Sequence, residues 1–315
     1  MRPLNTSRSG FACCAIATLL SGCGPTRMDA ISPTMQALTP GSQHAAVQRQ
    51  PKTRHAIVYI SSKIKASVYL VSYPSGKNIF TIIGFYAPAG LCSDGKGNVW
   101  VTDTDPYTGD GFLDEYAPGG KHAIATLEDP NNSPRACAVD PTTGNLAVAN
   151  SQDNIAIYPD AEGTPTYYST AGLVEKPSSI AYDAAGNAYL SGSSRKPGWL
   201  PAGAPAILSF KLKPNPSKHG PIRWDGRYLA VLVPGGSHDE VWRYELLGAS
   251  AKRVGIVELD CCMGDYAIDG SILAATLPAL DSASVSRYPA GGGAFLGLAA
   301  ADPTGIAISA SRAKK

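Results

Sequence analysis

Residues 88–101 are Pro88-Ala-Gly-Leu-Cys-Ser-Asp94-Gly-Lys-Gly-Asn-Val-Trp-Val101, and this stretch decides the fold. A short apolar segment leads into a turn that carries Asp94 and Gly97, and a second apolar segment follows. Asp, Asn and Gly tolerate the positive φ angles that tight turns between antiparallel strands require. The stretch therefore predicts two β-strands joined as a hairpin.

The hairpin pattern recurs along the chain at nearly equal intervals. Two longer copies are residues 134–148 and 177–190, and an Asp-Gly pair shortens the turn in two more, at Asp225 and Asp269. The turn aspartates, at positions 94, 140, 183, 225 and 269, are 46, 43, 42 and 44 residues apart. Residues 303–309 repeat the first strand once more and place Ser309 where the other copies have Asp.

Aromatic side chains form a second series with the same period. Six of them each close an outer strand: Tyr73, Tyr116, Tyr158, Phe210, Tyr244 and Tyr288. Their mean spacing is 43 residues, and hairpin repeats of roughly 40–50 residues are typical of β-propeller blades. Two series of six members predict an all-β, six-bladed β-propeller over residues 55–311.

The phase of the repeats predicts how the ring closes. The chain enters on an outer part of a repeat, residues 57–60, and ends on an inner part, residues 305–309. We therefore expect the C-terminal strand to pair into blade 1. Closure matters because an open arc would leave the apolar faces of two blades in water.

The repeats resemble the NHL family of propellers, whose pattern is P-x-G-I-x-x-D-x-x-G-N-x-x-V, and more distantly the gluconolactonase-like lactonases. Three further motifs look like those of a group of uncharacterised bacterial lipoprotein propellers: Cys137-x-Val-Asp-Pro-Thr-Thr-Gly-Asn-Leu-Ala-Val148, Trp224-Asp-Gly-x-Tyr-Leu229 and Tyr288-Pro-x-Gly-Gly292. The shared residues are turn and packing positions. The resemblance thus implies the fold and brings no activity with it.

The N-terminus has the features of an export signal. Arg2 and Arg8 precede the uncharged apolar run 10–20, which is too short to cross about 30 Å of hydrocarbon as a helix. The next residues, Leu20-Ser-Gly-Cys23, resemble the lipobox of bacterial lipoproteins. That resemblance implies cleavage before Cys23 and a diacylglycerol on its thiol. The alternative is a soluble secreted protein cut at a nearby small residue.

The body is therefore expected to be exported and lipid-anchored in the cell envelope. Gly24 stands where Asp would retain some Gram-negative lipoproteins in the inner membrane, and this favours the outer membrane. The chain is divided into a signal peptide (1–22), the lipidated Cys23 with a flexible tether (23–54), the propeller (55–311) and a basic tail (312–315).

Composition and charge exclude other classes. Hydrophobic residues make up 44% and charged residues 17% of the chain, which is enough apolar material for a core and too little charge for a disordered protein. Residues 55–311 carry 18 basic and 24 acidic side chains. A body with this net negative charge should not bind nucleic acid through its phosphates. We expect a monomer with a protein or small-molecule ligand at a propeller face.

An acidic segment is the candidate metal site. Asp103, Asp105 and Asp110 lie within eight residues, and Ca²⁺ prefers oxygen ligands. Tyr107 occupies the third ligand position of an EF-hand loop, and no Glu follows at the twelfth. A solvated loop is therefore the alternative. We expect no cofactor, with a divalent cation such as calcium as the other possibility.

A second metal arrangement follows from the lactonase resemblance, which implies an Asp, an Asn and a Glu around the central opening. Asp103 and Asn150 follow equivalent strands of neighbouring blades. Residues 57–62 contain no Glu, so the set is incomplete.

Four cysteines belong to the body. Cys92 and Cys137 lie in the first strands of adjacent blades, and their pairing would close a loop of about 45 residues. An oxidising compartment permits such a bond, whereas a large distance between blades would leave free thiols. Cys261 and Cys262 are left without an assignment.

One segment is the candidate partner contact. The aromatic series is interrupted between Tyr158 and Phe210, where the gap is 52 residues, and residues 192–205 between them contain three prolines and three glycines. This composition predicts a projecting loop. Arg195, Lys196 and Trp199 in it are residue types suited to an interface. The alternative is that Trp199 folds back over blade 4.

These observations predict a lipid-anchored envelope propeller that acts as a binding or protein-interaction module. The alternative is an enzyme, a metal-dependent lactonase- or lyase-type hydrolase with its site at the central opening. No catalytic residue is assigned.

The lipid anchor can be tested by changing Cys23 to Ala. Acylation needs the thiol and cleavage follows acylation, so the Cys23→Ala protein should remain uncut or become soluble. Metabolic labelling with a fatty-acid analogue measures the outcome. Label that persists in the variant would refute the assignment.

Overall fold

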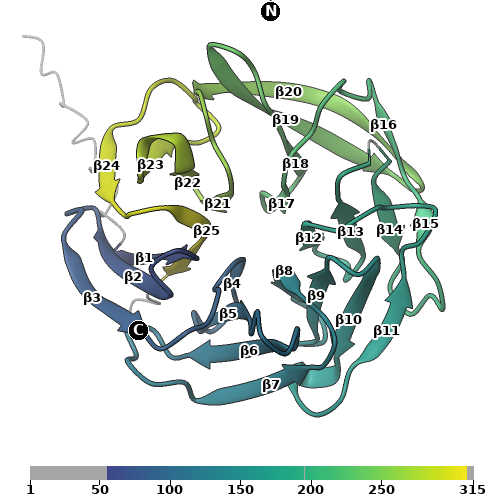
Figure 1. Cartoon of the computed structure of the whole chain (residues 1–315). Coiled ribbons are helices and arrows are strands. Elements are labelled where there is room, and N and C mark those ends of the chain that lie inside the picture. Colours follow the sequence, from purple (N-terminus) through teal and green to yellow (C-terminus); the bar gives the residue numbers. More distant parts are fainter. Residues whose placement is uncertain (1–54, 195, 311–315) are drawn as a thin grey trace, which may run out of the picture. The chain divides into compact units, whose positions relative to one another are not determined.

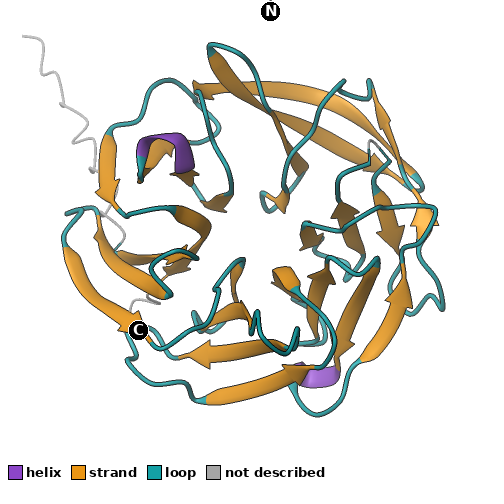
Figure 2. Ribbon diagram, viewed as in Figure 1, coloured by secondary structure: helices purple, strands orange, loops and turns teal. Residues whose placement is uncertain are grey.

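Six β-sheets surround a common axis in the computed structural model, which describes residues 55–194 and 196–310 (Figure 1). Helical structure in these residues is confined to two short 3₁₀ turns, η1 (Pro159–Ala161) and η2 (Pro278–Leu280) (Figure 2). The body is an all-β, six-bladed β-propeller, so the predicted fold class is confirmed.

The strands of each blade are given from the axis outward. Blade 1 contains β25 (Pro303–Ala310), β1 (Ala56–Ser62), β2 (Ser67–Tyr73) and β3 (Asn78–Ile83). Blade 2 contains β4 (Leu91–Ser93), β5 (Val99–Thr104), β6 (Gly111–Tyr116) and β7 (Ala125–Asp129). Blade 3 contains β8 (Pro134–Val139), β9 (Leu146–Asn150), β10 (Asn154–Tyr158) and β11 (Thr166–Ser169).

The second half of the ring follows the same plan. Blade 4 contains β12 (Ser179–Tyr182), β13 (Ala188–Ser191), β14 (Gly198–Leu200) and β15 (Leu208–Ser209). Blade 5 contains β17 (Ile222–Trp224), β18 (Leu229–Val233), β19 (His238–Leu247), β20 (Ser250–Asp260) and an outer strand, β16 (Lys211–Lys213), that runs parallel to β20. Blade 6 contains β21 (Tyr266–Asp269), β22 (Ile272–Leu277), β23 (Ser282–Arg287) and β24 (Leu296–Ala299).

Blade 1 is completed by both ends of the described chain. The C-terminal strand β25 pairs antiparallel with β1, and Ala56 is opposite Ala310. Ser309, at the position of the repeat aspartate, donates a hydrogen bond from its Oγ to the carbonyl of Gly97 in blade 2 at 2.5 Å. The predicted ring closure is confirmed.

The core is divided into six apolar clusters, and each fills the space between two neighbouring blades. The second strands β9, β13 and β22 are buried at every residue. This burial on both faces explains why their sequences are apolar at consecutive positions rather than at alternate ones.

One expectation about the outer series is wrong. The third strand of blade 4 is β14, and it ends at Leu200, not at Phe210. When Leu200 replaces Phe210 as the blade 4 member of the aromatic series, successive members are 42 to 44 residues apart, and no insertion interrupts the series. The sequence Leu200-Pro-Ala-Gly203 matches Tyr288-Pro-Ala-Gly291, so the turn motif marks the position although the aromatic ring is missing.

The segment 192–205 is consequently not the projecting loop that its composition predicts. Two of its prolines, Pro197 and Pro201, flank β14 rather than interrupt it. A Cβ at Gly198 would lie 2.8 Å from Val174 Cγ2, so the glycine allows this strand to pack closely. Strand pairing and burial therefore determine the structure of the segment.

Polar contacts join blades 5 and 6 near the turn of Asp225. The Asp225 side chain is 1% exposed and accepts hydrogen bonds from Arg243 Nε (2.7 Å) and the Tyr288 hydroxyl (2.7 Å). Burial opposes ionisation of Asp225, but the hydrogen bonds from Tyr288, Tyr228 and Arg243 outweigh it and lower the pKa of the carboxyl.

Replacing Asp225 by Asn should destabilise the propeller. The Asp225→Asn change leaves the half-buried Arg243 without its counter-ion, and we expect a loss of about 2–3 kcal/mol at neutral pH. A lowered pKa means that the carboxylate stabilises the fold above the ordinary aspartate pKa and ceases to do so as the pH falls through the lowered value.

The difference between wild type and Asp225→Asn should therefore shrink as the solution is acidified. Urea unfolding at several pH values measures it. Asp160→Asn, at an exposed turn position, is the matched control and should leave the unfolding midpoint unchanged. A difference that stays constant down to acid pH would contradict the assigned role of the carboxylate.

Candidate functional site

A cavity of about 1020 Å³ lies on the propeller axis. The innermost strands of all six blades contribute to its wall. In every blade, the residue directly before the turn aspartate, or before its equivalent Ser309, lines the cavity. These six residues are Ser93, Val139, Tyr182, Trp224, Ile268 and Ile308. The repeat thus uses one residue for the turn and its neighbour for the cavity.

The cavity also extends outward between blades 2 and 3. On the side of blade 2 it reaches Trp100, Glu115 and Ala125, and on the side of blade 3 it reaches residues 160–162. The turn 94–96 borders it as well, as do Pro141, Thr143 and Gly144 of the turn in blade 3. The mouth is therefore on the face that carries the turns after the innermost strands.

Arg223 is a cation in the cavity wall, and it is firmly held. Its Nε donates to the carbonyl of Tyr266 at 2.8 Å, its Nη1 donates to Ser179 Oγ at 2.9 Å, and its Nη2 forms an ion pair with Asp265. Burial raises the pKa of Asp265, against the opposing effect of the Arg223 charge. The guanidinium therefore links blades 4, 5 and 6 more than it offers a free charge.

The turn aspartates at the mouth serve the backbone. Asp94 accepts hydrogen bonds from the N–H groups of Lys96 and Asn98, both at 2.8 Å. Asp140 accepts from Thr142 and Thr143, and these bonds outweigh the effect of burial and lower its pKa. The carboxylates are turn residues, as their positions in the repeats indicate.

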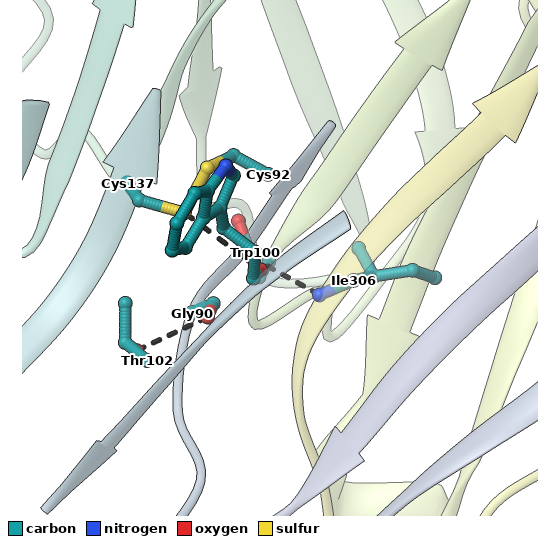
Figure 3. Close-up of a disulfide and its surroundings, with 7 residues drawn as sticks. Gly90, Cys92, Trp100, Thr102, Cys137 and Ile306 are labelled. Carbon is teal, nitrogen blue, oxygen red and sulfur yellow. Dashed lines mark hydrogen bonds between the residues drawn. A yellow bond between two sulfur atoms is a disulfide. The ribbon is translucent and has the colours of Figure 1, made fainter. Parts of the chain in front are cut away.

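A disulfide closes the wall where blades 2 and 3 meet. Cys92 in β4 and Cys137 in β8 are bonded with an S–S distance of 2.05 Å and a Cα–Cα distance of 5.5 Å, and the Trp100 indole lies against the bond (Figure 3). A Cβ at Gly90 would lie 2.3 Å from the carbonyl oxygen of Arg135. The glycine thus lets the two blades approach closely enough for the bond.

Asp103 and Asn150 lie at the other end of the second strands, away from the cavity mouth. The Asp103 carboxylate accepts the N–H groups of Tyr86 (2.8 Å) and Ala87 (2.6 Å) and so ties the loop from blade 1 to blade 2. Asn150 Nδ2 donates to Asp129 at 2.9 Å. The two side chains have different partners.

The other two acidic candidates also bind backbone groups. Asp105 Oδ1 accepts the Tyr107 N–H at 2.8 Å, and Asp110 Oδ1 accepts the Asn131 N–H at 2.9 Å. Within residues 55–194 and 196–310, no group of three or more His, Cys, Asp or Glu side chains could hold a metal ion. Calcium binding at Asp103, Asp105, Asp110 or Asn150 stays a prediction.

The residues of the candidate partner contact differ in their exposure to solvent. Lys196 is exposed, whereas Trp199 is half-buried, pairs with Tyr189 across the sheet and has its ring 6.3 Å from that of Phe210. Trp199 therefore packs at the seam between blades 4 and 5. Arg195 lies outside the described residues, as does Cys23.

The cavity residues Arg223 and Trp224 were not expected from the sequence. The sequence does contain a signal for Trp224, because the position directly before each turn aspartate recurs at the same place in every repeat. At the end of an inner strand, the side chain directly before the turn aspartate points either toward the propeller axis or into the space between two neighbouring blades. Only the assembled ring distinguishes these two directions.

Comparison with solved structures shows the fold. A nidogen/laminin complex structure contains a chain similar to this one at 14% identity and a TM-score of 0.59, covering 82% of this chain and 100% of that chain. A protein from Lactobacillus plantarum is similar at 14% identity and a TM-score of 0.55, covering 81% and 99%. The Myceliophthora Cps50 (Swd1) β-propeller domain is similar at 10% identity and a TM-score of 0.53, covering 79% and 87%.

Sequence comparison assigns no family. No family model matches the chain, and the curated proteins contain no match to it. Among the described residues, none of the helical segments has the length and hydropathy needed to cross a membrane.

The disulfide should stabilise the ring. It closes a loop with a sequence separation of 45, and the chain-entropy model gives about 3–4 kcal/mol for a loop of this size. Replacing both cysteines together, Cys92→Ser with Cys137→Ser, should lower the free energy of unfolding by about that amount. Chemical denaturation measures the loss. The matched control is Cys261→Ser with Cys262→Ser, which should leave stability nearly unchanged.

Proposed function

We propose that the protein is a binding module that takes a small organic ligand into its central cavity. The volume of about 1020 Å³ carries this proposal, because ligand sites in proteins are typically concave and about 300–1,000 Å³ in size. The mouth is bordered by turns and not by the strand ladders, so its residues other than the turn aspartates can vary without loss of the fold.

The lining indicates the chemistry of the ligand. Most of the positions before the turn aspartates are large and apolar or aromatic, and Trp224 among them is half-buried. At the rim, Lys96, Asp160 and Glu162 are exposed. An amphipathic molecule fits this arrangement, with its apolar body along the axis and its polar end among the charged groups of the mouth.

We place this module in the cell envelope, anchored through a lipid on Cys23. The lipobox-like Leu20-Ser-Gly-Cys23 supports the anchor. The Cys92–Cys137 bond supports an oxidising compartment, where disulfides persist. The turn pattern supports a relationship to the NHL propellers, without an activity.

The cavity can be tested by filling it. Ala138 lines it and is half-buried, and Ala138→Trp should occupy the part of the cavity beside blade 4, the blade against which Ala138 packs. A library of small amphipathic molecules is screened by thermal shift against the wild type, and each compound that stabilises it is measured by calorimetry against the variant. We expect at least a tenfold loss of affinity.

Val254→Trp, at an exposed position in β20, is the control and should bind as the wild type does. Compounds that bind Ala138→Trp with full affinity would place the site elsewhere. A library in which nothing stabilises the wild type would argue against a small organic ligand.

A further inference from the structure

Two adjacent thiols lie in the loop between β20 and β21, outside the cavity. Cys261 is half-buried and Cys262 is exposed, and neither takes part in a disulfide. The same chain has a disulfide between Cys92 and Cys137, so it is built for a compartment in which exposed thiol pairs are oxidised. The pair is thus the part of the described chain most open to thiol chemistry.

The two thiols contact each other. The pKa of the Cys262 thiol is raised, first by its hydrogen bond with Cys261, and also by burial and by the charges of Cys261 and Asp239. A raised pKa lowers the thiolate fraction and slows disulfide exchange at neutral pH. The equilibrium between the dithiol and the disulfide form of the pair does not depend on the rate of exchange.

The backbone of this loop is in an unusual conformation. Cys262 has a φ of 77°, in the left-handed region that residues with a Cβ seldom adopt. Contacts on the C-terminal side hold it there. The Met263 N–H donates to Asp239 Oδ2 at 2.7 Å, and the Gly264 N–H donates to the Thr276 carbonyl at 3.0 Å. Such outliers tend to occur at functional and switching segments.

Asp239 connects the thiol loop to the neighbouring loop of blade 5. Its buried carboxylate accepts the Met263 N–H through one oxygen and the Gly235 N–H, at 2.9 Å, through the other. A change in the backbone at Cys262 would therefore act on residues 234–237 as well. Both loops are on the face opposite the cavity mouth.

We propose that Cys261 and Cys262 form a reversible redox pair that closes to a disulfide between adjacent residues. The oxidant is an external low-molecular-weight disulfide. One thiolate attacks it, forms a mixed disulfide and releases one small thiol. The thiolate of the neighbouring cysteine then attacks the protein sulfur of the mixed disulfide and releases the second small thiol. The protein loses two protons and two electrons, and the external disulfide gains them.

The pair can be isolated in one peptide. Trypsin cleaves after Arg253 and Arg287, and the peptide between them contains Cys261 and Cys262 and no other cysteine. The full-length chain is equilibrated in mixtures of reduced and oxidised glutathione, treated with N-ethylmaleimide, and digested without reduction. Mass spectrometry then measures the peptide 254–287.

We expect the peptide to lose the mass of two hydrogen atoms and to take up no maleimide, and we expect reduction to reverse both changes. A peptide that keeps two maleimides in mixtures where the Cys92–Cys137 bond remains would overturn the proposal. A peptide that carries glutathione or a second chain at equilibrium would overturn it as well.

The single variants Cys261→Ser and Cys262→Ser provide the matched comparison. Each lacks the neighbouring thiol that displaces glutathione, so each should retain one glutathione where the wild type retains none. Equal amounts of the adduct in wild type and variants would show that the two thiols react independently. Melting temperatures equal to that of the wild type establish that the variants are folded.

Discussion

The pairing of β25 with β1 is the interaction on which the rest of this structure depends. Each of the six apolar clusters needs two blades to enclose it, so the last cluster forms only when the C-terminal strand reaches blade 1. A ring with one open seam would expose Val58, Ile306 and Ile308 to water.

Within that constraint each repeat places a turn residue next to a residue that lines the cavity. Four of the turn aspartates bind N–H groups of their own turns and hold the ends of the inner strands together: Asp94, Asp140, Asp183 and Asp225. The residues directly before them face the cavity. Of these, Tyr182 and Ile308 also belong to the apolar core between blades, whereas Ser93 and Trp224 lie outside the core clusters. A change at Ser93 or Trp224 therefore alters the wall of the cavity and leaves both the turn and the core intact.

Much of the fold could be predicted from the sequence, because turn chemistry is local. Asp and Gly at a turn need no distant partner to have their effect, so the period, the number of blades and the closing strand follow from their spacing. The outer series failed at Leu200 because the third strand requires a large apolar side chain and not an aromatic one. The close packing of the buried Gly198 against Val174 and Ile207 likewise overrides the composition of its segment.

The site was less predictable, for a different physical reason. A carboxylate such as that of Asp103 can bind a cation or backbone N–H groups, and only the position of the Tyr86 loop decides between them. The cavity is made by six strands that are far apart in the sequence. No single repeat contains the information that its neighbours leave a space at the axis.

The position of β1 in its sheet has a mechanical consequence. The strand has a hydrogen-bonded neighbour on each side, β2 and β25, and the described chain enters it at Ala56 from the rim of the turns. A force applied to Ala56 along the axis of β1 loads both ladders in shear, so their bonds must yield together and not one after another. The blade that closes the circle is thus also the one that resists a pull on the N-terminal end.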